Sequence, residues 1–334
     1  MYYLTIAIPT YNRKEPLINT LNKLLPQLND NCFLLIIDNH SDVFVSDYAI
    51  DLIEKHAQVN YELIRNRVNV GGNCNILRCF EYCKTDWLWV LGDDDELLPN
   101  AVETILFDIT KYPEALNINY YSPNVIHPLR TKTTISYGRG QFVESIDSFG
   151  AAIFISTNIY NSKLIGNDMM LANHYAYTCV PQFLAVFFAS QEDTITVNSH
   201  EIICVNGSDD RIYKYSNYNL LIAKGFASIL EIPTDKEIKN ILLARLRETT
   251  HYWLTIDGII KTLLVEYFKS NRRLDIAFAF KQHYLHFYKL LGIKNKMKFY
   301  FYFSILLFSP RVLFKIINFL YRRYKGIELT IPNE

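Results

Sequence analysis

The sequence predicts an α/β fold: a doubly wound, mostly parallel sheet followed by a C-terminal α-helical extension. Over roughly the first 125 residues, short apolar segments alternate with amphipathic helical segments, which is typical of parallel strands joined by helices. Beyond Ile232 the apolar residues recur at helical spacing. The chain has 334 residues, half of them hydrophobic, so it can bury a full core, and this composition argues against disorder.

The expected elements follow in order along the chain. Strands are predicted at about residues 4–9, 33–37, 61–64, 87–91 and 115–121, and helices at about residues 15–28, 45–56, 76–83, 100–112 and 178–189. Pro16 falls in the first turn of its helix, where proline is well tolerated. Residues 122–148 are rich in proline and glycine and predict loops, and residues 149–158 predict a strand or a buried turn.

An acidic cluster stands where the fourth strand leaves the sheet. The apolar residues 87–91 and Gly92 are followed directly by Asp93, Asp94, Asp95 and Glu96. Carboxylates this close repel one another unless a cation or water offsets their charge. Oxygen ligands suit Mg²⁺ or Mn²⁺, which usually also hold substrate phosphates, so Asp93, Asp94 and Asp95 are the candidate metal ligands. The alternative is a solvated acidic turn.

Other polar clusters follow the neighbouring strands. They are Thr10, Tyr11, Asn12 and Arg13 after the first strand, Asp38 and Asn39 after the second, and Gly71, Gly72 and Asn73 after the third. Taken alone, each cluster could be a turn or a helix cap. Ligands of open α/β sheets bind beyond the carboxyl ends of the strands, so together the clusters predict a pocket for a nucleotide and a metal.

These four motifs, in this order, resemble those of the family 2 glycosyltransferases, which have the GT-A fold. The resemblance covers about the first 125 residues. It implies that the loop from Pro9 to Tyr11 and Asp38 hold the base and ribose of a nucleoside diphosphate sugar, and that an Asp-x-Asp element holds the metal on its pyrophosphate. The donor-binding residues implied in this way are Pro9, Thr10, Tyr11, Asn12, Arg13, Asp38, Asn39, Gly71, Gly72, Asn73, Asp93 and Asp94.

One position departs from the family pattern. Gly92 stands where the first Asp of the element is usual, so the metal ligands could be Asp94, or Asp93 and Asp95. Family members that resemble O-antigen and abequosyl-type transferases carry the same Gly-Asp-Asp-Asp variant.

The general base is harder to place. An inverting transfer needs a base to take the proton of the acceptor hydroxyl. Many relatives carry a Glu-Asp pair at the start of a later helix, whereas here the predicted helix at 178–189 begins without an acid. His174 is the nearest titratable residue and Asp168 the next, although a lone histidine is more often structural.

Charge and cysteine content bear on location. The six cysteines show no zinc-binding spacing, which is typical of reduced thiols in a cytosolic protein. The first residues lack the basic region and cleavage site of a signal peptide, so none is expected, and no apolar run reaches the roughly 18 residues that a membrane span needs. Residues 276–327 contain ten Lys or Arg and no acid, and residues 309–325 form a basic and apolar helical pattern. We therefore expect a cytoplasmic protein on the inner membrane surface, the alternative being a helix packed on the protein itself.

The expected organisation is a donor-binding half at 1–125, an acceptor-binding half at 126–230 and a helical region at 231–334. The expected function is transfer of a sugar from a nucleoside diphosphate sugar to a hydroxyl of a glycan or lipid-linked glycan, in bacterial surface polysaccharide synthesis; no nucleic-acid partner is expected. A nucleotidyltransferase is an alternative, but it would normally carry a Gly-rich, basic triphosphate loop after the first strand. A non-catalytic membrane-associated scaffold is another, and the missing Glu-Asp pair favours it.

Overall fold

The computed structural model describes most of the first 205 residues and part of the remainder. The described residues are 3–56, 59–123, 129–147, 149–178, 180–205, 225, 228–248, 296–298, 300–301, 304–305, 312, 315–316, 318–319 and 322–323. The chain divides into two compact units, Met1–Asp209 and Asp210–Glu334, and each is described by itself.

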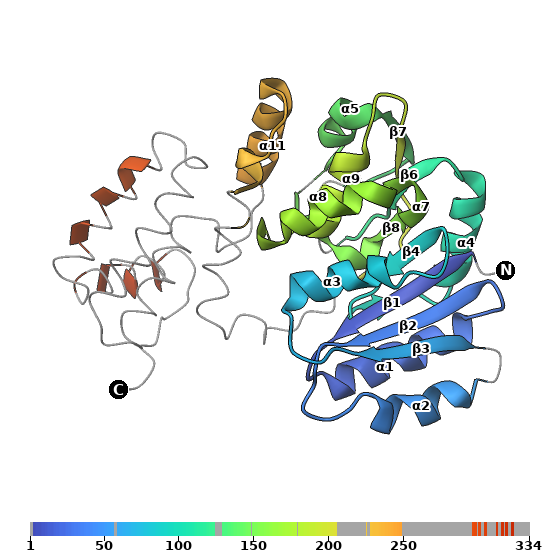
Figure 1. Cartoon of the computed structure of the whole chain (residues 1–334). Helices are drawn as coiled ribbons and strands as arrows, with labels where there is room; N and C mark the ends of the chain where they lie inside the picture. The colour runs from blue at the N-terminus through green and yellow to red at the C-terminus, as the bar shows by residue number, and fades with distance from the viewer. Residues whose placement is uncertain are drawn as a thin grey trace. The chain divides into compact units, whose positions relative to one another are not determined.

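The first unit is built on one eight-stranded sheet with the order β3-β2-β1-β4-β8-β6-β9-β7 (Figure 1). Its strands are β1 (Leu4–Thr10), β2 (Cys32–Asp38), β3 (Asn60–Arg65), β4 (Trp87–Val90), β6 (Ala115–Asn119), β7 (Thr134–Tyr137), β8 (Asn158–Asn161) and β9 (Ile195–Asn198). Strands β8 and β7 run antiparallel to their neighbours, and the other pairs are parallel. The predicted α/β, mostly parallel fold is confirmed.

Helices cover both faces of this sheet. They are α1 (Lys14–Leu24), α2 (Ser46–Glu54), α3 (Gly72–Glu81), α4 (Ala101–Lys111), α5 (Gly138–Glu144), α6 (Phe149–Ile153), α7 (Ser162–Ile165), α8 (Met169–His174) and α9 (Pro181–Ala189). Helices α1 and α2 lie on one face of β1, β2 and β3, and α3 lies on the other (Figure 1). The five helices predicted in this unit are all present, as α1, α2, α3, α4 and α9.

The core shows why these segments fold as they do. Alternate residues of β1, such as Ile6 and Ile8, are fully buried in one cluster with Leu17 and Leu21 of α1 and Ile53 of α2. The period of two along the strand and of three to four along the helix brings these side chains to one interface. Since the central strands are covered on both faces, they are apolar almost throughout.

The topology places the strand ends that carry the polar clusters at one edge of the sheet. Strands β1, β2, β3, β4, β6 and β9 run in the same direction, because β4 and β6 are each antiparallel to β8. The chain order reverses between β1 and β4, the position where open α/β sheets bind ligands beyond the carboxyl ends of the strands.

Two local predictions were only partly right. Residues 122–148 are not all loop, since they contain β7 and α5; β7 is an edge strand with mostly exposed side chains, so no apolar alternation marks it. Residues 149–158, predicted as a strand or a buried turn, contain the helix α6 followed by a buried 3-10 turn, η2 (Ile155–Thr157). A short apolar run does not distinguish a buried helix from a strand by its periodicity.

In the second unit, a 3-10 turn, η6 (Ile229–Glu231), precedes α11 (Lys236–Glu248). Thr234, Asp235, Lys236 and Glu237 have the sequence of a capping box, which predicts a helix start here, and the helix is present. The Thr234 hydroxyl has no hydrogen-bond partner, however, so this threonine does not cap the helix. The helical spacing of apolar residues also predicts helices at about 256–268 and 274–291, which lie outside the described residues. The described residues between 296 and 323 are helical. Among the parts of the chain that are described, no helix is long and apolar enough to cross a membrane.

Candidate active site

The acidic turn after β4 is tied to the loop after β1. Asp93 accepts hydrogen bonds from the Thr10 hydroxyl at 2.7 Å and from the Arg13 guanidinium at 2.8 Å, and its backbone carbonyl accepts one from Thr20 at 3.0 Å. Only 4% of Asp93 is exposed. Burial raises the pKa of this carboxyl to about 6, while Arg13 and Thr10 oppose the rise. Arg13 therefore favours the ionised form of a carboxylate that burial alone would protonate.

Arg13 spans two carboxylates. Its Nη1 binds Asp93, and its Nη2 donates to Asp94 Oδ2 at 2.7 Å. The Asp94 side chain is 18% exposed, against 6% for that of Asp93. Asp94 thus presents the more accessible carboxylate of the pair to a ligand.

Asp95 turns the other way, into the protein. Its Oδ2 accepts a hydrogen bond from Ser156, which is fully buried and also accepts one from the Gly92 amide at 2.8 Å. A side chain at position 92 would collide with the Asp95 carboxylate and crowd the Ser156 hydroxyl. The space that the family's usual Asp would need at position 92 is thus filled by Asp95.

The three aspartates do not converge on one point as placed here. Among the described residues, no group of three or more His, Cys, Asp or Glu side chains is arranged to hold a metal ion. Asp93 is engaged by Thr10 and Arg13, and Asp95 by Ser156. The oxygen donors still suit Mg²⁺ or Mn²⁺, since such ions often use one or two carboxylates together with substrate phosphates. Asp94 fits that role best.

The end of β2 carries a second buried carboxylate. Asp38 is fully buried, accepts the Ser41 amide at 2.8 Å and forms an ion pair with Arg65. Arg65 ends β3 directly opposite Asp38 in the parallel register. Its guanidinium also donates to the Ser41 carbonyl and lies 4.2 Å from the centre of the half-exposed Phe44 ring. This arrangement places a cation, a carboxylate and an aromatic face together at the sheet edge.

Asn12 joins the first two loops. It has a positive φ of 55°, which asparagine tolerates better than most residues. Its side chain accepts from the Asp42 amide and donates to the Asp42 carboxylate, and its own amide donates to the Ser41 hydroxyl. Tyr11, beside it, is 41% exposed. The turn therefore holds Arg13 against the acidic residues while leaving the Tyr11 ring on the surface.

Asparagines organise the glycine loop. Asn39 accepts the Val70 amide and donates to Asn69, and Asn69 in turn accepts the Gly71 amide at 2.8 Å. Gly71 has a φ of 85°, a conformation that favours glycine, and a Cβ added to Gly71 or Gly72 would meet no atom within 4 Å. The backbone at the start of α3 is thus open to close approach by a ligand.

The two candidate bases lie on the segment around α8. His174 ends α8, is exposed and packs edge-on against Tyr175; Asp168 lies at the other end, half-buried, in the 3-10 turn η3 (Gly166–Asp168). Asn73 donates to the Ala176 carbonyl at 3.0 Å, which connects the glycine loop to the chain two residues beyond His174. The glycine loop is thus hydrogen-bonded to the chain just beyond the His174 end of α8.

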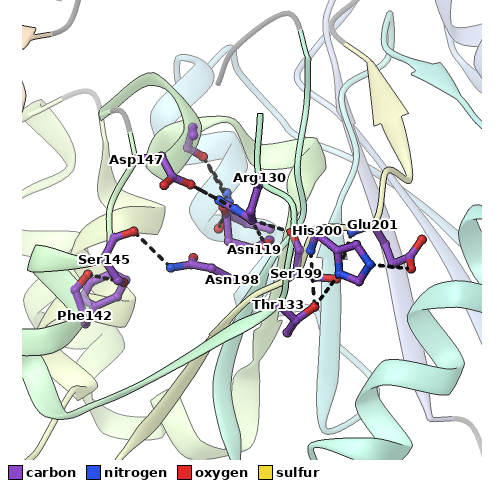
Figure 2. Close-up of polar contacts among 12 residues, drawn as sticks. Asn119, Arg130, Thr133, Phe142, Ser145, Asp147, Asn198, Ser199, His200 and Glu201 are labelled. Atoms are coloured by element: carbon purple, nitrogen blue, oxygen red, sulfur yellow. Dashed lines mark hydrogen bonds and ion pairs between the residues drawn. The ribbon is translucent and has the colours of Figure 1, made fainter. Parts of the chain in front are cut away.

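A further polar cluster lies at the ends of β6 and β9 (Figure 2). Arg130 donates to the backbone carbonyls of Asn119 at 2.8 Å and Ser199 at 2.6 Å and forms an ion pair with Asp147. Asn198 donates to the Ser145 carbonyl. These bonds fasten residues 145–147 to the carboxyl edge of the sheet, in the half of the unit where an acceptor was expected.

Sequence analysis missed several residues that build the site. Arg65, Ser156 and Thr20 each bind one of the predicted aspartates, and Arg130 holds the second polar cluster. Arg65 could have been found from the strand pairing, since it ends the strand next to Asp38. Ser156 could not, because the prediction of a strand or a buried turn across its position does not indicate a partner for its hydroxyl.

Residues 5–160 match the family model described as Glycosyl transferase family 2, which confirms the resemblance seen in the motifs. An uncharacterized glycosyltransferase of Haemophilus influenzae is 31% identical over 127 residues, which cover 38% of this chain and 39% of the relative. The abequosyltransferase RfbV of Salmonella typhimurium is 31% identical over 109 residues, which cover 30% of each chain. The matches therefore span well under half of both curated relatives.

Solved structures agree on the fold. TarS 1-349 of S. aureus superposes with a TM-score of 0.53 at 13% identity, covering 85% of this chain and 89% of TarS 1-349. The mannosyltransferase PcManGT from Pyrobaculum calidifontis, solved with GDP-Man and Mn²⁺, gives a TM-score of 0.50 at 11% identity, covering 98% of this chain and 89% of that one. At these identities the similarity supports the GT-A fold alone.

The packing around Gly92 gives a stability prediction. Gly92→Ala should lower the free energy of unfolding by about 1–3 kcal/mol, because the new methyl group must push the Asp95 carboxylate away from Ser156. Gly140→Ala, in α5 with no atom within 4 Å of the added Cβ, is the matched control and should be neutral or slightly stabilising. Urea unfolding of both variants tests this, and equal stabilities would contradict it.

Proposed function

Because residues 5–160 match the model of glycosyltransferase family 2, we propose that this chain transfers a sugar from a nucleoside diphosphate sugar to a hydroxyl of a glycan acceptor. The observation that carries the proposal is the cluster of Arg13, Asp93 and Asp94 at the switch point of the sheet, with the Asp38–Arg65 pair at the ends of the neighbouring strands β2 and β3. A role in bacterial surface polysaccharide synthesis follows by analogy with the abequosyltransferase relative.

The donor would lie along the carboxyl ends of β1, β2 and β4. Asp38 and Arg65 would hold the base and ribose, and the exposed Tyr11 and Phe44 rings offer apolar surface beside them. Arg13 would face the diphosphate, since a guanidinium matches the geometry of phosphate oxygens. The open backbone at Gly71 and Gly72 would allow the donor to approach α3 closely.

A divalent metal, Mn²⁺ or Mg²⁺, would be held by Asp94 together with the phosphates. When bound, such an ion stabilises the negative charge that grows on the departing nucleoside diphosphate. Asp93 and Asp95 would act indirectly, since their contacts with Thr10 and Ser156 fix the turn that carries Asp94. This assignment selects Asp94 from the alternatives that the sequence left open.

The acceptor would bind on the α8 side. A hollow of about 700 Å³ lies between α3 and the segment from α7 to α8, and its lining includes Arg78, Glu81, Met169 and Asn173. Mixed polar and apolar walls suit a sugar, whose hydroxyls need hydrogen-bond partners. His174 follows this lining and is our preferred general base over Asp168, because Asn73 connects the glycine loop to its end of α8.

The site also bears on the two alternatives. A nucleotidyltransferase would need a basic Gly-rich loop after β1, and here the only basic side chain of the segment from Tyr11 to Arg13 is engaged with Asp93 and Asp94. A non-catalytic scaffold would have no need for a cation shared between two carboxylates at the sheet edge. Turnover of the donor separates catalysis from both.

Donor hydrolysis tests the proposal. The full chain, incubated with UDP-, GDP-, dTDP- and CDP-sugars, should release one nucleoside diphosphate slowly and only with Mn²⁺ or Mg²⁺. Asp94→Asn should reduce the rate about 100-fold, because the charge stabilisation is lost. Glu96→Gln, which removes an exposed carboxylate from the same segment, should leave it unchanged. If no nucleoside diphosphate is released from any donor, even with acceptor glycans present, the proposal is contradicted.

The C-terminal segment would bring the enzyme to the membrane surface. Phe301 and Phe319 are about 60% exposed, and Lys315, Arg322 and Arg323 are exposed on described helical turns. The Arg323 guanidinium lies 6.0 Å from the centre of the Phe319 ring. Exposed aromatic and basic side chains together fit the interface of an anionic bilayer, where an acceptor on a lipid carrier would be found.

Vesicle binding tests this location. The chain should cosediment with anionic vesicles at low salt and far less with neutral ones. Replacing Lys315, Arg322 and Arg323 by Gln should weaken binding about 100-fold, since each basic residue near the surface contributes about 1 kcal/mol. The control replaces the exposed Lys23, Lys84 and Lys163 of the first unit by Gln. Equal losses in the two triple variants would contradict a specific role for the C-terminal segment.

A further inference from the structure

The Arg13 guanidinium contacts the Asp94 carboxylate, which the proposed function assigns to the metal ion. We propose that Arg13 acts as a tethered cation that pairs with the Asp94 carboxylate in the donor-free protein and disfavours metal binding there. A divalent metal would then bind tightly only together with the diphosphate of the donor. This inference rests on the proposed function, because it concerns the order in which that site takes its ligands. Its consequence is strong coupling between metal and nucleotide.

The two ends of the guanidinium have different surroundings. Nη1 binds Asp93 Oδ1 at 2.8 Å, and Asp93 is buried and held by Thr10 and Thr20. Nη2 binds Asp94 Oδ2 at 2.7 Å at the more exposed end of the pair. The contact with Asp93 can therefore serve as an anchor, while the contact with Asp94 lies at the end that a ligand reaches.

A metal ion cannot simply be added to this arrangement. One oxygen of Asp94, Oδ2, already accepts a charge-assisted hydrogen bond from Arg13, and a metal ion at either oxygen would lie beside the guanidinium and be repelled by it. The neighbouring carboxylates offer little compensation, because Asp93 is engaged by Arg13 and Thr10, and Asp95 by Ser156. A metal alone must therefore either bind against the charge of Arg13 or displace its contact with Asp94.

A bound diphosphate makes metal binding at Asp94 more favourable. Its oxygens provide ligands for the metal and a new anionic partner for Arg13, with which a guanidinium can form two parallel hydrogen bonds. Nη2 can leave Asp94 for a phosphate while Nη1 stays on Asp93. Because each ligand then favours binding of the other, metal and nucleotide must enhance each other's affinity by the same factor.

Measurements of metal affinity, which need no turnover, test this role of Arg13. Mn²⁺ binding to the full chain, followed by the electron paramagnetic resonance of free Mn²⁺, should be weak alone and rise at least about 100-fold with UDP or GDP, whichever nucleotide binds. Arg13→Gln should bind Mn²⁺ alone about tenfold more tightly than the parent, and the enhancement by nucleotide should shrink. Adding Asp94→Asn to Arg13→Gln should abolish the gain. These factors correspond to losing an ion pair at a partly buried site.

Two further variants serve as controls. Lys23→Gln removes a cation from the exposed ion pair with Glu96 and should behave as the parent does. Arg13→Lys keeps one positive charge but loses the planar fork, so its Mn²⁺ affinity should lie between those of the parent and Arg13→Gln. It also keeps the test available if Arg13→Gln does not fold.

The outcomes distinguish the role proposed for Arg13 from the proposed function. If Mn²⁺ binds in the presence of nucleotide and requires Asp94, but Arg13→Gln and Arg13→Lys bind Mn²⁺ alone no more tightly than the parent, the role of Arg13 is wrong while the metal-dependent function stands. If Mn²⁺ binds no variant with any nucleotide, both the role of Arg13 and the metal in the proposed function are wrong.

Discussion

The ion pairs of Arg13 with Asp93 and Asp94 are the interaction on which the candidate site depends. Three aspartates in sequence at the end of a buried strand would repel one another, and burial makes the charge on Asp93 costly. A guanidinium from the neighbouring loop offsets that charge, and Thr10 satisfies the remaining oxygen of Asp93. Groups of the protein itself thus offset the charge of a dense acidic turn.

The sheet supplies the geometry that this arrangement needs. Strands β1 and β4 are parallel neighbours, so the loops that follow them emerge at the same edge and Arg13 can reach the acidic turn. The neighbouring strands β2 and β3 also end side by side, which brings the Asp38 carboxylate to the Arg65 guanidinium. On the far side of β4, Ser156 fixes Asp95 and so sets which carboxylate remains accessible. Cation–carboxylate pairing at successive strand ends is the common feature.

Sequence reasoning reached the parallel half of the fold because β1, β2 and β4 are buried almost throughout and form nearly continuous apolar runs. It failed for β7, whose exposed side chains leave no alternation, and for α6, whose five residues are too few to show a period. It located the aspartates of the site but not their partners. Which carboxylate pairs with which cation depends on strand register and on side-chain direction, and neither is encoded locally.

The most direct test of the central claim is hydrogen–deuterium exchange of the full chain with and without Mn²⁺ and each nucleoside diphosphate. If the sheet edge is the donor site, one nucleotide should slow exchange in four segments together, residues 9–13, 38–42, 65–73 and 92–96. Protection confined to other segments, or none with any nucleotide, would contradict the account.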